Sequence, residues 1–213
     1  MTLLSFKGGV HPPEKKLTKN AEIKTTPLPQ KVVVFMLQHA GAPAKPIVQV
    51  GQQVKTGQVI GEPQGTISAY VHSPVTGTVT SVSKINSPVH GMAVEAITIE
   101  RTSDDDWELL PAVDYERASR EELLDIVKKA GIVGLGGAMF PTHVKLAPPK
   151  PVDTLIINGA ECEPYLTIDH RVMIERNDEV LLGIEITKKI LGVKSVYIGI
   201  EYNKKDAIDL LEK

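Results

Sequence analysis

Closely spaced glycines limit how long any regular element can run in the first half of this chain. Between residues 41 and 91 they stand at seven positions, Gly41, Gly51, Gly57, Gly61, Gly65, Gly77 and Gly91. Glycine weakens helices and favours turns, so this spacing argues against long helices there. The segments between the glycines are short and rich in β-branched residues. They predict a small barrel or sandwich of short strands over residues 31–100.

Two segments of this region form a more specific pattern. Residues 50–61 contain two glycine turns flanked by alternating valines, and residues 72–79 contain a Ser-Pro turn followed by a glycine. The pair resembles the biotinyl/lipoyl-like barrel-sandwich hybrid domain, whose carrier members place a modified lysine between the two segments. Residues 62–72 of this chain contain no lysine. We therefore expect a scaffold domain that carries no lipoyl or biotinyl group.

The sequence pattern changes after an acidic linker at residues 101–118. Ser119 and Glu122 form a capping box before apolar residues at helical spacing, which predicts a helix ending at Gly131. Buried strands are predicted at 152–159 and 195–200, a helix at 178–191, and the start of a further helix at Asn203. This strand–helix–strand–helix order predicts a parallel α/β domain over residues 119–213.

The two ends of the chain have their own features. Residues 1–30 contain several prolines and little periodicity, so we expect an extended arm that lies on another surface. The chain stops at Lys213 inside a helical pattern, and a complete parallel sheet needs more strands. We therefore expect this domain to be incomplete and the chain to be part of a longer protein.

Composition excludes several classes of protein. Apolar residues make up 42% and charged residues 23% of the 213 residues, which is typical of a folded chain. The net charge of −2 disfavours a nucleic-acid binder, and no apolar run approaches the ~18 residues of a membrane span. The N-terminus lacks the pattern of a signal peptide. The single cysteine, Cys162, allows neither an internal disulfide nor a cysteine-only metal site, so a reducing intracellular compartment is expected.

A glycine-rich segment is the first candidate for chemistry. Residues 134–138 read Gly-Leu-Gly-Gly-Ala, but they follow a helix rather than a strand, so a Rossmann fingerprint is not indicated. Glycines allow backbone N–H groups to approach an anion or a planar ring closely. Lys145 could supply a cation to a phosphate. The alternative is a glycine-rich turn that merely ends the preceding helix.

The second candidate directly follows the predicted strand at 152–159. Asn158, Glu161, Cys162 and Glu163 stand within six residues, and the carboxyl ends of parallel strands are where ligands bind in α/β sheets. The alternative is a solvated turn. Cys162 as a nucleophile is disfavoured, because no neighbouring base precedes His170.

Four motifs then occur in the order seen in the C subunits of the Rnf electron transport complex, a family similar to the flavin- and NADH-binding subunit of respiratory complex I. The motifs are GGVHPP at 8–13, GGAMFPTHVK at 136–145, NGAECEPY at 158–165 and DHR at 169–171. The resemblance implies an electron transfer subunit of a ferredoxin:NAD oxidoreductase coupled to ion translocation. Its cofactors would be FMN and NAD(H), and full-length members also carry two 4Fe-4S clusters that this chain lacks.

The resemblance also implies site residues. FMN would be bound by Gly134, Gly136, Gly137, Lys145, Asn158 and Glu161, and the nicotinamide nucleotide by Phe140 and Glu163. In this chain the FMN residues would line an open cleft. No residue is assigned as an acid, base or metal ligand, because the cofactor carries the hydride chemistry. The chain differs from the complex I pattern at three positions, where Leu135 replaces an arginine, Met139 a glycine and Ala160 an aspartate.

The family implies a setting as well. The partners would be NADH and other subunits of the Rnf membrane complex, and the location the cytoplasmic side of the plasma membrane, held there peripherally without a transmembrane segment. Family members continue into a second glycine–glutamate flavin loop and a ferredoxin-like region, so we expect this chain alone to be inactive. The alternative function is a non-catalytic assembly module of a membrane complex.

Overall fold

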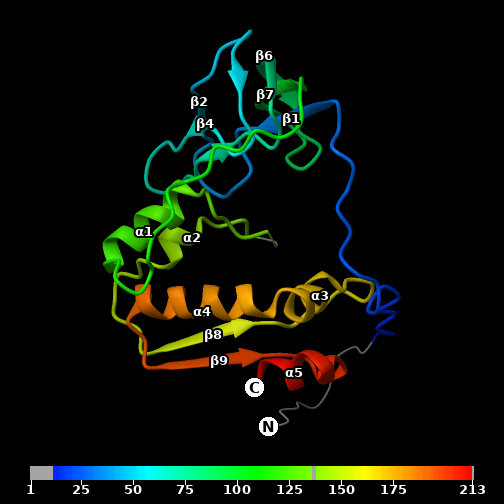
Figure 1. The fold of residues 1–213 in the computed structure, drawn as a ribbon, viewed down its shortest axis with the longest axis vertical. Helices are drawn as coiled ribbons and strands as arrows, with labels where there is room; N and C mark the ends of the chain where they lie inside the picture. The colour runs from blue at the N-terminus through cyan, green and yellow to red at the C-terminus, as the bar shows by residue number, and fades with distance from the viewer. Residues whose placement is uncertain (1–11, 136–137, 213) are drawn as a thin grey trace. The chain divides into compact units, whose positions relative to one another are not determined.

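The computed structural model describes residues 12–135 and 138–212, which form two compact units. The α/β unit consists of the segment ending at Thr25, Asp153–Lys188 and the residues from Val193 onward. The β unit consists of Thr26–Val152 and Lys189–Gly192. Figure 1 labels the elements of both units, and each unit is described by itself below.

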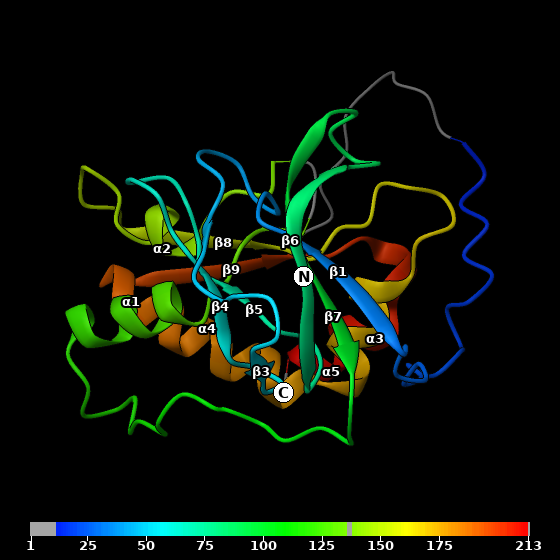
Figure 2. The same ribbon diagram turned by 90° about the horizontal axis from the view of Figure 1, so that it is seen from above.

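The β unit contains two antiparallel sheets built from seven strands. Its strands are β1 (Lys31–Phe35), β2 (Lys45–Pro46), β3 (Gln53–Val54), β4 (Val59–Glu62), β5 (Val71–His72), β6 (Gly77–Asn86) and β7 (Ala93–Arg101). One sheet has the order β1-β7-β6-β3 and the other the order β2-β4-β5. Figure 2 shows the long β6–β7 hairpin from above. The predicted β-rich region is therefore confirmed, and all of residues 40–95 are described without an α-helix.

The core of the β unit lies between these sheets. Ile97 and Ile99 of β7 are fully buried, and they join a cluster with Met36, Ile60 and Val79. Close backbone approach decides one position of β6, because a Cβ on Gly77 would lie 2.2 Å from the carbonyl oxygen of Glu100. A glycine is therefore needed where β6 begins beside the end of β7.

Two helices follow the sheets within the β unit. Helix α1 (Arg120–Lys129) has the predicted capping box: the Ser119 side chain accepts from the Glu122 N–H, and the Glu122 carboxylate accepts from the Ser119 N–H. Gly131 follows with a φ of +66°. Helix α2 (Thr142–Lys145) is a single turn and contacts α1. By its contacts, α1 belongs to the same compact unit as the seven strands. The change of sequence pattern predicts a domain boundary at residue 119 instead, and that boundary stays a prediction.

The α/β unit is built on two parallel strands, β8 (Thr154–Asn158) and β9 (Ser195–Gly199). They are connected through α3 (Ile168–Glu175) and α4 (Asn177–Leu191), and β9 is followed by a 3₁₀ turn (Tyr202–Lys204) and α5 (Lys205–Leu211). The strand–helix–strand order and the parallel pairing are confirmed. Helix α3 was not predicted as a helix. Among residues 12–135 and 138–212, no helix is both long and apolar enough to cross a membrane.

Candidate functional site

In the β unit, residues 133–134 and 140–141, on the two sides of the glycine-rich segment, pair with each other, and this pairing is called the hairpin below. The Gly134 N–H donates to the Phe140 carbonyl over 3.0 Å, and Val133 and Pro141 pair as an isolated antiparallel bridge. Met139 has a φ of +45°, a backbone region that glycine adopts with less strain. Its carbonyl accepts from the Ala40 N–H over 2.9 Å, which ties the hairpin to the strands. The predicted ligands Gly136 and Gly137 lie outside the described residues.

The other predicted residues near this hairpin differ in exposure. Lys145 is the last residue of α2 and is exposed, so its ammonium is accessible to an anion. Phe140 is half-buried at the closing end of the hairpin, whereas Leu135, next to Gly134, is 96% exposed. The β unit therefore presents an exposed cation close in sequence to the glycine-rich segment.

The strand-end loop, residues 158–167, belongs to the α/β unit. Asn158 ends β8 and is exposed; its side-chain oxygen accepts from the Ala160 N–H over 3.0 Å, so its amide NH₂ group remains turned to the surface. Close packing explains why residue 159 is a glycine, because a Cβ there would lie 3.1 Å from the Ile200 side chain and 3.2 Å from the Met173 sulfur. Cys162 is exposed, and Glu163 lies in the same stretch of the loop.

Glu161 is the exception in this loop, because its residue is only 3% exposed. One carboxylate oxygen accepts from the Asp169 N–H at the start of α3 over 2.8 Å. The other lies 3.8 Å from the Lys204 ammonium and has no hydrogen-bond partner among the described residues. Glu161 is therefore buried rather than exposed, and the assignment of its carboxylate to FMN stays a prediction. Its carboxylate is used inside the α/β unit, where it caps a helix and faces a buried lysine.

Lys204 connects two carboxylates in the interior of this unit. It is 2% exposed, and it hydrogen-bonds the Glu201 carboxylate and lies near that of Glu161. Burial alone would raise the pKa of Glu201, but the hydrogen bonds from Lys204 and from the Glu161 N–H outweigh it and lower that pKa. Burial, and next the charge of Glu161, raise the pKa of Asp169. The network therefore favours the charged form of Glu201 and disfavours that of Asp169.

Two further residues of this neighbourhood were not among the predicted site residues. Lys16, in the N-terminal segment, lines a cavity of about 190 Å³ together with Glu161, Thr167 and Lys204. No sequence signal marked it. His170 is buried with its Nε2 2.8 Å from Asp206, and it stands in the DHR motif that the resemblance had already marked. Burial would raise the pKa of Asp206, but the His170 hydrogen bond lowers it.

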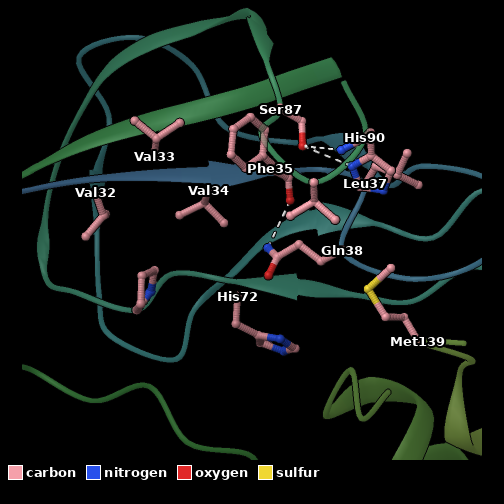
Figure 3. A pocket seen from close by; sticks show the side chains of 12 residues that line it. Val32, Val33, Val34, Phe35, Leu37, Gln38, His72, Ser87, His90 and Met139 are labelled. Atoms are coloured by element: carbon pink, nitrogen blue, oxygen red, sulfur yellow. Dashed lines mark hydrogen bonds between the residues drawn. The ribbon is translucent and has the colours of Figure 1, made fainter. Parts of the chain in front are cut away.

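A larger cavity lies in the β unit, beside β1 (Figure 3). Its volume is about 580 Å³, and its lining combines valines of β1 with Phe35, His72 and Met139. The Gln38 side-chain NH₂ donates to the Phe35 carbonyl over 2.9 Å. The Ser87 hydroxyl and the His90 Nδ1 lie 3.0 Å apart in the same lining. Of the predicted cofactor residues that the structure describes, none lines this cavity.

The predicted ligands are thus divided between the two units. Gly134, Phe140 and Lys145 lie on the hairpin and α2 of the β unit. Asn158, Glu161 and Glu163 lie together on the strand-end loop of the α/β unit. In the part of the chain that the structure describes, no three His, Cys, Asp or Glu side chains group as they would around a metal ion.

Comparison with known families gives this geometry a context. Residues 4–104 match the family model of the RnfC barrel sandwich hybrid domain, and residues 127–213 match that of the Nuo51 FMN-binding domain. These matches confirm both predicted domain types.

Curated relatives match nearly the whole chain. The C subunit of the proton-translocating ferredoxin:NAD(+) oxidoreductase complex of Clostridium ljungdahlii is 46% identical over 216 residues, covering 99% of this chain and 47% of that protein. The C subunit of the Na(+)-translocating ferredoxin:NAD(+) oxidoreductase complex of Acetobacterium woodii is 43% identical over 214 residues, covering 98% and 48%. The C subunit of the ion-translocating oxidoreductase complex of Rhodobacter capsulatus is 45% identical, with 98% and 41% covered. The chain spans about half the length of these relatives.

Proposed function

Because the chain belongs to the RnfC family, the C subunits of ion-translocating oxidoreductase complexes, we propose that it forms the FMN- and NAD(H)-binding part of such a protein. The observation that carries this proposal is the match of residues 127–213 to an FMN-binding domain. When bound, FMN supplies the exchange between hydride and single-electron transfer. The chain's own residues bind and orient it.

The exposed residues suit parts of the FMN molecule. The Lys145 ammonium is exposed and can pair with a phosphate. Gly134, Gly136 and Gly137 of the same segment are proposed for the close approach to FMN that glycines allow. The Asn158 amide is exposed at the end of β8, where α/β sheets bind ligands. The Glu161 carboxylate does not offer a contact of this kind, so we assign it to the support of the loop. Phe140 and Glu163 are proposed for the nicotinamide nucleotide.

The wider role follows from the relatives. We propose that the protein passes electrons between NAD(H) and iron–sulfur clusters in a ferredoxin:NAD oxidoreductase complex at the cytoplasmic face of the membrane, beside the other subunits. A 4Fe-4S cluster usually has about four cysteine ligands. Cys162 is the single cysteine of this chain, so the clusters would be held elsewhere in a longer protein.

The proposal is tested by comparing FMN with riboflavin, which lacks the phosphate. We expect FMN to bind the more tightly, and the substitution K145M to weaken FMN binding by about tenfold, since hydrogen bonds to charged groups contribute ~1.5–3 kcal/mol. Riboflavin binding should stay unchanged in K145M. The matched control is K150M, which removes another exposed lysine of the same segment.

Flavin fluorescence gives the affinities, and bleaching of the bound flavin by NADH reports the nucleotide. If neither this chain nor a full-length relative such as the Clostridium ljungdahlii protein bound flavin, the non-catalytic assembly module would be the better interpretation. The apolar cavity beside β1 would then be the first surface to examine for a partner.

A further inference from the structure

We propose that Lys16, in the N-terminal segment, is a positioning residue for the strand-end loop of residues 158–167; the inference rests on the proposed function of that loop. The ammonium of Lys16 donates to three backbone carbonyls, those of Glu161, Glu163 and Leu166, over 3.0, 2.9 and 2.9 Å. These partners are 145 to 150 residues away in the sequence. One side chain therefore joins both halves of the loop that carries the predicted FMN and nicotinamide contacts.

The number of contacts fits the chemistry of a lysine. A protonated ammonium has three N–H donors and no acceptor, and here each donor has a carbonyl oxygen. The three oxygens converge on one point, an arrangement that is stable only when a cation or donor group occupies that point. The Glu163 carbonyl also accepts from the Leu166 N–H over 3.3 Å. Without Lys16 the carbonyls of Glu161 and Leu166 would lose their donor and the three dipoles would face each other without a cation, so the loop would have to change conformation.

The rest of the N-terminal segment keeps Lys16 in place. The hydroxyls of Thr18 and Thr167 lie 2.6 Å apart, and the Ile23 N–H donates to both carboxylate oxygens of Glu175 over 3.1 Å. The Arg171 guanidinium adds a bond to the Lys19 carbonyl over 3.3 Å. Moving from residue 16 to residue 23, the contacts are made first with the strand-end loop and then with α3. Residues 16–23 therefore lie along both (Figures 1 and 2).

Fixing these carbonyls also directs the neighbouring N–H groups. In a planar trans peptide the C=O and the following N–H point in opposite directions. The Glu161 carbonyl points to Lys16, so the Cys162 N–H points to the other side of the loop. The same holds for the Leu166 carbonyl and the Thr167 N–H. Lys16 thus sets which side of the loop presents donors to a ligand, and it fixes the backbone that carries the Glu163 side chain.

Lys16 acts on the backbone of the loop, whereas Lys204 acts on its buried side chain. Lys204 holds the carboxylates of Glu161 and Glu201 from the interior of the unit. Because the two lysines contact different groups, the loss of Lys16 should loosen the loop without removing the ion network beneath it. This separation is what makes the inference testable.

The test uses three variants. K16M keeps the length of the side chain and removes its charge, and K16R restores a charged group with N–H donors. K24M, which removes an exposed lysine of the same segment, is the matched control. Hydrogen exchange of peptides covering residues 161–169 is measured on the 213-residue chain without flavin. We expect exchange to quicken at least about tenfold in K16M, partly recover in K16R and stay unchanged in K24M, since lost hydrogen bonds to a charged group contribute ~1.5–3 kcal/mol. Peptides from α4 should not change in any variant.

Flavin and NADH titrations supply the second readout. We expect K16M to weaken FMN binding by about tenfold, with partial rescue in K16R, for the same physical reason. Faster exchange in K16M would support the ordering of the loop even if neither the wild-type chain nor a full-length relative bound flavin, a result that would reject the proposed function alone. Unchanged exchange in K16M would overturn the inference whatever the flavin result. If K16M does not fold, T18V replaces it, and unchanged exchange at residues 166–169 in T18V would overturn the inference in the same way.

Discussion

For single residues, a sequence motif predicts position along the chain better than it predicts the surroundings of the side chain. The resemblance assigned Glu161 to FMN by its motif, and the residue follows strand β8 as expected, although β8 alternates between exposed and half-buried residues where a buried strand was predicted. The direction of its side chain depends on Lys204 and Asp169, which meet it only after folding. Sequence could therefore predict the loop and the position of Asn158 at the strand end, but not which carboxylate turns inward. The long-range partner Lys16 was equally beyond an interpretation based on local spacing.

The buried pair gives a prediction at this scale. In K204M the carboxylates of Glu161 and Glu201 lose their cation in a region where Lys204 is only 2% exposed. Breaking a buried ion pair by removing one partner costs ~3–5 kcal/mol, because a charge is left uncompensated. We expect a loss of this size in urea unfolding of the α/β unit.

The double variant E161Q/K204M should recover part of the lost stability, since it removes one of the stranded charges. The matched control is K129M, which breaks the exposed ion pair with Asp125 and should leave the urea midpoint nearly unchanged. Equal losses in K204M and K129M would show that the interior network contributes nothing beyond an ordinary surface pair.

Elements with local signals were the ones that could be predicted. Helix α1 carries its own capping box, and α4 occupies Asn177–Leu191 and is followed by Gly192 with a φ of +67°. Helix α3 has no side-chain cap of its own from Thr167, and its first turn is capped instead by the distant Glu161. Its eight residues offer little periodicity, so neither the start nor the length could be found from sequence.

Contacts between elements of the β unit lead to a prediction about pH. Burial lowers the pKa of His72 on β5, although a hydrogen bond to the Lys129 backbone at the end of α1 opposes it. Burial, followed by the charges of Lys128 and His39, lowers the pKa of His143 on α2. A histidine with a lowered folded pKa binds fewer protons than in the unfolded chain. The stability of the β unit is therefore fully present above the unfolded pKa of ~6.5 and falls as the pH drops toward the folded value.

The urea midpoint of the β unit should accordingly decrease when the pH is lowered from about 7.5 to about 5.5, a range that brackets the unfolded pKa of histidine. Hydrogen exchange or proteolysis of the β6–β7 hairpin measures this midpoint. In the double variant H72N/H143N that decrease should be smaller. H90N, at a histidine on the rim of the cavity in Figure 3, serves as the control and should retain the wild-type dependence. A decrease of the same size in H72N/H143N and the wild type would rule out these two histidines as its source.

At the scale of the whole molecule, the two domain types and the family were accessible from sequence because long motifs carry them. The match to the RnfC barrel sandwich hybrid and Nuo51 FMN-binding families agrees with that interpretation. The two compact units defined by contacts could not be predicted from sequence. Helices α1 and α2 belong to the β unit, although their sequence pattern is that of the α/β domain. Compact units follow from tertiary contacts, and those are not visible in local periodicity.

The final prediction concerns flavin affinity and the length of the chain. The chain spans about half of its relatives, and in the family pattern a second glycine–glutamate loop contributes to the flavin site. About three or four hydrogen bonds of roughly 1 kcal/mol each would then be missing, and each ~1.4 kcal/mol is a factor of ten in affinity. We therefore expect the 213-residue chain to fold but to bind FMN about a hundred to a thousand times more weakly than the full-length Clostridium ljungdahlii protein. Fluorescence titration of both, under the same conditions, measures the ratio. Equally tight binding by the two would show that the 213-residue chain already contains every residue that the flavin site needs.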